Sequence, residues 1–360
     1  MIEYKNGNLL IAPTEALVNT VNTEGVMGKG IALQFRNAFP QMYKAYEAAC
    51  KNGAVKLGKM HVFDLGGLAG GPRWIINFPT KGHWRSKSRL QDVAAGLADL
   101  VQTINELKIQ SIAIPPLGCG NGGLSWELVR PLIEQALAQV PSVRIQVFEP
   151  GQTPASADMP IRTERPRMTN GRAVLVLLIE RYMKGLMDPF VSLLEVHKLM
   201  YFMQLAGEPL RLEYQKGKYG PYAPNLEKAL RHVEGHFISG FGDGVSSPEK
   251  PLELLPHGVE EAVRFLEPQV ITQERLDRVT RLIEGFEDAY GMELLSSTLW
   301  AMVHSPDARQ SVDAAILYVH AWNDRKLTTL KSEHIVHAWN RLKVQGWDSI
   351  ASTMNTQGAH

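Results

Sequence analysis

The sequence predicts a layered α/β domain in residues 1–154 and a mostly helical domain in residues 171–360, joined by a linker in residues 155–170. In the first part, short β-rich runs alternate with segments of helical period, which is typical of a sheet covered by helices. In the last part, hydrophobic residues recur at helical spacing and no strand alternation of comparable strength competes. Between the two, Pro160 and Pro166 stand among scattered charges without a hydrophobic period, which favours a linker.

The predicted elements follow in chain order. In the first domain the expected strands are 16–19, 74–78, 112–115 and 143–148, and the expected helices are 31–39, 41–50, 90–107 and 126–139. Pro40 ends the first of these helices because proline cannot continue one. In the second domain the expected helices are 172–184, 193–205, 226–236 and 260–266, followed by a helical stretch over 273–303 that is interrupted near Gly291.

Composition limits the class of protein. The chain has 360 residues, 44% of them hydrophobic and 21% charged, which is enough apolar material for two ordinary domains. Residues 1–155 hold 15 Lys and Arg against 11 Asp and Glu (+4), and residues 156–360 hold 23 against 26 (−3), so the total is +1. This balance permits a nucleic-acid substrate on the first half and a basic partner on the second.

The sequence pattern predicts neither a membrane span nor a signal peptide. The longest strongly apolar run, 173–179, is far too short to span a membrane, and the first residues lack the basic head and apolar core of a signal peptide. The chain has two cysteines, Cys50 and Cys119. A reducing cytoplasm, without membrane attachment, is the expected location.

A glycine-rich segment over 115–124 follows one predicted strand and precedes a predicted helix. Its four glycines let backbone N–H groups turn toward one point, and a helix N-terminus nearby adds positive potential. That geometry suits a diphosphate, although such a cluster by itself is more often a tight turn. A second glycine cluster, 25–30, also follows a predicted strand and opens a helix. Because ligands bind at the carboxyl ends of strands in open α/β sheets, we expect both clusters to face one crevice.

These motifs resemble those of the macrodomain family, whose members bind ADP-ribose. The blocks 19–22, 25–30, 76–81 and 115–123 are similar in particular to the DarG antitoxins, which remove ADP-ribose from thymine bases in DNA after the toxin DarT has attached it. The resemblance implies a three-layer α/β fold with a mixed central sheet. It also implies an antitoxin hydrolase, a DNA ADP-ribosyl glycohydrolase, acting on single-stranded DNA. The implied ADP-ribose contacts are Asn8, Leu9, Asn22, Gly28, Lys29, Gly30, Ile31, Thr80, Gly118, Cys119, Gly120, Asn121, Gly122, Gly123 and Leu124.

Two of these positions have a structural alternative. Other macrodomains carry an aspartate where this chain has Asn8, so Asn8 is equally an ordinary turn residue beside Gly7. Asn22 matches the asparagine that contacts the distal ribose, and its alternative is a cap on the next turn.

Cys119 is interpreted as a small structural side chain rather than a nucleophile. We expect no metal site, because the histidines and cysteines lack ligand spacing, and no cofactor.

Lys81 is the expected catalytic residue, on the resemblance and on its place just after a predicted strand. Two roles stay open: an ammonium that donates a proton to the leaving base, or a neutral amine that attacks C1″ of the ribose. Relatives that cleave ADP-ribosyl esters carry an aspartate where this chain has Gly122. Its absence favours a nucleotide substrate over a protein.

The segment 81–89 combines positive charge with aromatic rings, so His83, Trp84 and Arg85 are candidate DNA contacts. The alternative is that Ser88 and Gln91 form a capping box for the next helix while Trp84 packs beneath the loop.

The second domain continues the resemblance through 215–225 and 234–243, which implies that it binds a DarT-like toxin. The carboxylates of Glu284, Glu287, Asp288 and Glu293 are candidates to occupy the basic DNA groove of that toxin, or else form one solvated helix face. Two other functions stay open: a module that only binds ADP-ribose, and a hydrolase of small or protein-linked ADP-ribose derivatives.

Overall fold

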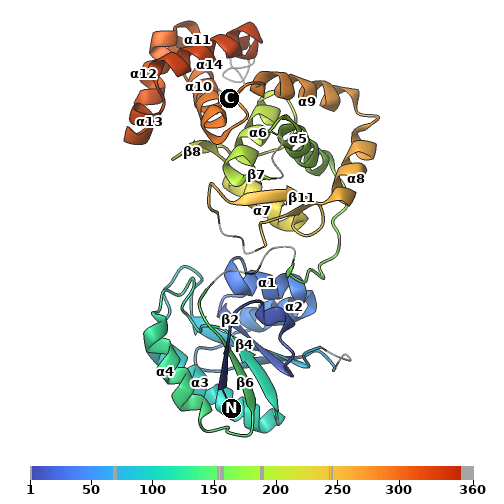
Figure 1. Cartoon of the computed structure of the whole chain (residues 1–360), viewed down its shortest axis with the longest axis vertical. Coiled ribbons are helices and arrows are strands. Elements are labelled where there is room, and N and C mark those ends of the chain that lie inside the picture. The colour runs from blue at the N-terminus through green and yellow to red at the C-terminus, as the bar shows by residue number, and fades with distance from the viewer. Residues whose placement is uncertain are drawn as a thin grey trace. The chain divides into compact units, whose positions relative to one another are not determined.

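The computed structural model describes residues 2–349 apart from 68–70, 152–153, 155–157, 187–189, 243 and 245. Part of the predicted linker, one residue of the 234–243 motif and the end of the second domain therefore lie outside the described residues. The chain divides into two compact units, the first made mainly of Met1–Glu164 and the second of Arg165–Phe241 with Ser246–His360 (Figure 1). Each unit is described by itself.

Unit 1 is built on a six-stranded mixed sheet in the order β1-β6-β5-β2-β4-β3. Neighbouring strands run parallel except β3 and β4, which are antiparallel. The strands are β1 (Ile2–Lys5), β2 (Ala16–Asn22), β3 (His61–Asp64), β4 (Trp74–Lys81), β5 (Ser111–Ile114) and β6 (Arg144–Phe148). The four predicted strands are present, and β2 and β4 are each three residues longer than expected. The two strands that the sequence did not reveal, β1 and β3, are the short edge strands.

Helices cover both faces of this sheet. The helices are α1 (Gly30–Ala38), α2 (Pro40–Lys51), α3 (Leu90–Leu107) and α4 (Trp126–Leu137), with a short 3-10 turn, η1, at Leu9–Ile11. Helices α1 and α2 lie over one face of the sheet and α3 and α4 over the other (Figure 1). Alternate residues of β2 face opposite layers: Val18 packs in the cluster that holds the α3 and α4 side chains, whereas Leu17 packs in the cluster of α1 and α2. The expected three-layer α/β fold with a mixed sheet is thereby confirmed.

Close packing fixes β4 against α3. A Cβ on Gly96 of α3 would lie 2.3 Å from the ring of Phe78, so only glycine lets the helix approach the strand this closely. Phe78 is fully buried. The carboxyl ends of β2, β4 and β5 meet at one edge of the sheet, because these strands are parallel. At that edge Asn22 pairs with Lys81 after a shift of register, which brings the two loops that follow β2 and β4 together.

Unit 2 is mostly helical, as predicted. Its helices are α5 (Asn170–Leu186), α6 (Leu193–Leu205), α7 (Pro224–Val233), α8 (Pro256–Leu266), α9 (Val270–Ile283), α10 (Ala289–His304), α11 (Pro306–Gln310), α12 (Val312–His320), α13 (Asp324–Thr329) and α14 (Ser332–Val344). Short strands that periodicity did not reveal are β7 (Val191–Ser192), β8 (Gln215–Gly217), β9 (Gly220–Tyr222), β10 (Ile238–Ser239) and β11 (Pro251–Leu254). They form one three-stranded sheet and one hairpin.

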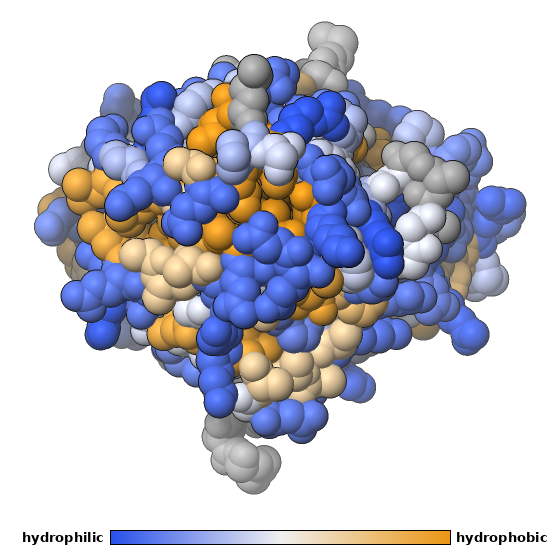
Figure 2. Space-filling view, turned by 90° about the horizontal axis from the view of Figure 1, so that it is seen from below, coloured by the Kyte–Doolittle hydropathy of each residue, from blue (hydrophilic) through white to orange (hydrophobic). Residues whose placement is uncertain are grey.

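The core of unit 2 surrounds α6 and α10, which are buried on nearly every side. The predicted break near Gly291 lies instead between α9 and α10. Asp288 caps α10 by accepting the Gly291 N–H, so Gly291 lies inside the first turn of the helix. On the face shown in Figure 2, hydrophobic patches lie between hydrophilic side chains. Within the described residues, no helix combines the length and apolar character needed to cross a membrane.

Candidate functional site

Three segments meet at the carboxyl edge of the unit 1 sheet. We call them the first glycine loop (residues 23–29, after β2), the lysine loop (residues 81–89, from the end of β4) and the second glycine loop (residues 115–124, after β5). The lysine loop is tied to both of the others. Thr23 donates its backbone N–H and its hydroxyl to Gly82 O, at 3.1 and 3.0 Å, and His83 lies 3.6 Å from the carboxylate of Glu24.

Asn22 organises the first glycine loop. Its side-chain oxygen accepts the N–H groups of Glu24 (2.9 Å) and Val26 (3.3 Å), and its Nδ2 donates to Val26 O at 2.6 Å. Tyr46 donates its hydroxyl to Asn22 O. Both ends of the buried carboxamide are therefore engaged in the turn, and its contact with a ribose stays a prediction.

The start of α1 offers uncapped backbone N–H groups. Lys29 is the N-cap residue and makes no side-chain capping bond, so the first amides of the helix are open to an acceptor. Gly28, Gly30 and Ile31 lie in this turn. A Cβ on Gly30 would come 2.9 Å from Asn121 Nδ2, which shows how closely the second glycine loop approaches. An anion is stabilised at such a helix N-terminus.

The second glycine loop folds back on itself. Leu124 donates its N–H to Gly118 O and Gly123 donates to Gly120 O, both at 3.0 Å. Gly118 and Gly123 have φ of 72° and 75°, values that favour glycine. A Cβ on Gly122 would lie 2.4 Å from Gly118 O and 2.3 Å from Ser88 Oγ. The loop thus has no room for a carboxylate at position 122, whereas Gly120 and Asn121 are exposed.

Lys81 lies where the lysine loop meets the second glycine loop. Its Nζ donates to Trp84 O at 2.9 Å and to Asn121 O at 3.2 Å. Burial lowers the pKa of this half-buried amine. No carboxylate of the described residues lies within 4 Å of it. The preceding Thr80 is buried and donates its hydroxyl to Val21 O.

The candidate DNA contacts lie on the exposed part of the lysine loop. Trp84 is 43% exposed, its ring stacks with His83 at 5.6 Å between centroids, and the Arg85 guanidinium lies 4.5 Å above it. The alternative capping box is wrong. Arg89 is the N-cap residue of α3 without a side-chain bond, and the buried Ser88 hydroxyl has no partner among the described residues.

Asn8 and Leu9 lie in a different setting. Asn8 caps η1 by accepting the Leu10 N–H at 3.0 Å, and its Nδ2 donates to Asp158 O at 2.8 Å. Leu9 is 4% exposed in the core cluster that also holds Met27. Their implied ADP-ribose contacts stay predictions.

The thiol of Cys119 donates to Leu117 O, and burial raises its pKa to about 11. Such a thiol is protonated at neutral pH, which agrees with a structural role. The described residues contain no group of three or more His, Cys, Asp or Glu side chains arranged to hold a metal ion.

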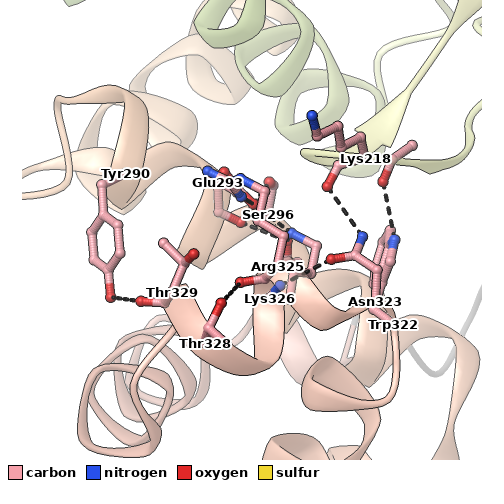
Figure 3. A network of polar contacts seen from close by, with 12 residues as sticks. Lys218, Tyr290, Glu293, Ser296, Trp322, Asn323, Arg325, Lys326, Thr328 and Thr329 are labelled. Carbon is pink, nitrogen blue, oxygen red and sulfur yellow. Dashed lines mark hydrogen bonds and ion pairs between the residues drawn. The ribbon is translucent and has the colours of Figure 1, made fainter.

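The carboxylates of unit 2 have mostly structural contacts. Glu293 is 3% exposed on α10 and pairs with Arg325 (2.5 Å) and Lys326 (2.8 Å) (Figure 3). Asp288 caps α10, and Glu287 accepts the Gly285 N–H. Glu284 is exposed. Of these four residues only Glu293 is buried, while Glu284, Glu287 and Asp288 lie at the end of α9 and in the turn before α10, so the four do not form one solvated helix face.

The network around Glu293 also anchors the β8–β9 hairpin. Trp322 donates to Gly217 O at 3.0 Å and Asn323 donates to Lys218 O at 3.2 Å (Figure 3). From α6, the buried Lys198 donates to Pro221 O at 2.7 Å, and burial lowers its pKa to about 7. Sequence reasoning missed this cluster, since its members are far apart in the chain.

Comparison with known proteins defines the class. The Macro domain family matches residues 18–133, which makes unit 1 a macrodomain. A DNA ADP-ribosyl glycohydrolase of Thermus aquaticus is 46% identical over 351 residues, covering 96% of this chain and 94% of its own. The chain therefore belongs to the family of DNA ADP-ribosyl glycohydrolases, the DarG proteins, and the predicted resemblance is confirmed.

Two further relatives match part of the chain. The solved macrodomain of Mycobacterium tuberculosis DarG is 56% identical and covers 42% of this chain and 99% of its own, with a TM-score of 0.41. A protein of Thermosipho africanus described as a DNA ADP-ribosyl transferase and DNA ADP-ribosyl glycohydrolase fusion is 32% identical over 158 residues, 40% of each chain.

Proposed function

We propose that unit 1 hydrolyses the N-glycosidic bond between ADP-ribose and a thymine base in single-stranded DNA, reversing a DarT-like modification. The observation that supports the proposal is the position of the Lys81 amine, which donates to Asn121 O of the second glycine loop, the loop expected to bind the diphosphate. The absence of space for an acidic side chain at Gly122 supports a reaction with one charged side chain and a bulky leaving base.

In this reaction the bond between C1″ and the base nitrogen breaks, and its electron pair stays on the base. The base takes up a proton, and the oxygen of water bonds to C1″, releasing ADP-ribose. As an ammonium, Lys81 donates that proton and regains one from the attacking water. As a neutral amine it forms a covalent intermediate with C1″ that water then resolves.

The pH dependence separates these two roles. Burial lowers the pKa of Lys81 from its ordinary value of 10.5. If the ammonium is the active form, kcat falls as pH rises through this lowered pKa. If the neutral amine is the active form, kcat rises over the same range.

The experiment incubates the full chain with an oligonucleotide that carries ADP-ribosyl thymine and follows release by gel shift. We expect turnover by the parent chain and a severe loss for Lys81→Ala, with ADP-ribose affinity largely kept. Equal rates for the two proteins contradict the role of Lys81. Binding of ADP-ribose without release by the parent chain favours a binding module, and release only from modified protein favours a different substrate.

The exposed side chains of His83, Trp84 and Arg85 support DNA contact beside Lys81, through ring stacking and phosphate pairing.

The two cysteines are free thiols, which supports action in the reducing cytoplasm. No cofactor is needed by the proposed hydrolysis.

We further propose that unit 2 binds and neutralises a DarT-like toxin. The fusion relative, which joins a transferase to a glycohydrolase in one chain, supports this pairing. Calorimetry of the full chain with a catalytically inactive toxin tests this proposal. If no heat of binding is measured at either low or moderate salt, the proposal is wrong. Glu284→Lys is the charge reversal of choice, because Glu284 is exposed and its side chain has no hydrogen bond or ion pair among the described residues.

A further inference from the structure

Ser88 is a buried residue whose hydroxyl has no hydrogen-bond partner among the described residues. It is 6% exposed, and only its backbone N–H is engaged, donating to Gly122 O at 3.0 Å. A buried hydroxyl without a partner lowers stability, so its presence calls for an explanation.

The Ser88 side chain lies against the backbone of the second glycine loop. A Cβ on Gly122 would lie 2.3 Å from Ser88 Oγ, and one on Gly118 would lie 3.2 Å from the same atom. The hydroxyl therefore fills the space that a side chain at position 122 would need, and it touches the loop where it folds back on itself.

The same part of the loop holds Lys81. The amine donates to Asn121 O at 3.2 Å, and Ser88 N–H donates to the next carbonyl along the chain, Gly122 O. The two ends of the lysine loop thus bind adjacent carbonyl groups. If the 121–122 segment shifts, the acceptor that places the amine shifts with it.

We infer that Ser88 is a positioning residue for Lys81: its side chain fills the space beside Gly118 and Gly122, keeps the second glycine loop from moving into that space, and so sets where Asn121 O and the Lys81 amine lie. This inference rests on the proposed hydrolysis and deepens it. It accounts for the unpartnered hydroxyl, because groups kept for function often reduce stability. Removing the hydroxyl should therefore slow turnover without weakening the fold.

The test compares Ser88→Ala with the matched control Ser86→Ala in the full chain. Ser86 lies in the same loop but is exposed, and its side chain has no hydrogen bond among the described residues. For Ser88→Ala we expect an equal or higher Tm, an ADP-ribose Kd within about threefold and a kcat lowered about 10- to 100-fold, since small misplacements of a reacting group have large effects. The part of the pH profile of kcat that reports the titration of Lys81 should move to higher pH. The reason is that water entering the loosened loop relieves the burial that lowers the pKa of Lys81.

The outcomes are distinguishable. If the parent chain releases no ADP-ribose, the proposed function fails and this inference fails with it. If the parent is active and Ser88→Ala matches it in kcat and in this part of the pH profile, the inference is overturned while the proposed function stands. A lowered Tm for Ser88→Ala, or an equal loss in Ser86→Ala, also overturns it, since either result indicates a general structural role.

Discussion

Gly122→Ala is the substitution whose effect follows most directly from the site geometry. The new Cβ would lie 2.3 Å from Ser88 Oγ and 2.4 Å from Gly118 O. Such distances do not occur in folded proteins, so the loop has to move. Overpacking of this kind costs about 1 to 3 kcal/mol. For a unit of this size each kcal/mol lowers Tm by roughly 2 to 4 °C, so the expected decrease is about 2 to 12 °C.

The matched control is Gly120→Ala in the same loop. Neither glycine has a positive φ, and a Cβ on Gly120 meets nothing within 4 Å. We therefore expect Gly120→Ala to leave Tm unchanged. A loss of ADP-ribose affinity in this variant without a change in Tm would mean that the ligand itself lies against Gly120.

The assay is thermal unfolding of the full chain with and without ADP-ribose, because a ligand raises the transition of the unit that binds it. We expect Gly122→Ala to lower that transition and to weaken ADP-ribose binding about tenfold or more. A Gly122→Ala chain that melts and binds like the parent would refute the steric reasoning, since the loop would then accept a side chain without cost.

Three further predictions concern other parts of the chain. Trp84→Ala should weaken binding of single-stranded DNA by about 1 to 3 kcal/mol per stacked base, measured by fluorescence anisotropy, and leave ADP-ribose affinity unchanged; an equal loss for both ligands contradicts the stacking role. Glu293→Gln should destabilise unit 2 by roughly 3 to 5 kcal/mol in urea unfolding, because it leaves Lys326 buried without a counter-charge, whereas Glu284→Gln should change stability by less than about 0.5 kcal/mol. The folded pKa of Lys198 is lowered to about 7 from its ordinary 10.5, so between these values the unfolded chain binds more protons and stability should rise with pH; a urea midpoint that does not rise from pH 7 to pH 9, or that rises equally in Lys198→Met, contradicts this assignment.

The sequence by itself determined the fold class and the candidate loops. Hydrophobic periodicity is a local property, so it located α3 and α6 to the residue and the four inner strands of the unit 1 sheet to within a few residues. The short edge strands and the two-residue strands of unit 2 carry too few residues for a period to appear. Glycine clusters and the family motifs also made Lys81 the candidate catalytic residue before any contact was known.

Only the tertiary structure decided how these pieces act on one another. That Ser88 fills the space beside Gly122, that Lys81 binds Asn121 O, and that Glu293 is buried with Lys326 all depend on residues about 30 to 40 positions apart. No pattern along the chain reports such distances, because they arise from strand order and helix packing. For that reason the sequence grouped Glu293 with the acidic residues 284–288, and only the fold shows that Glu293 is buried against Lys326.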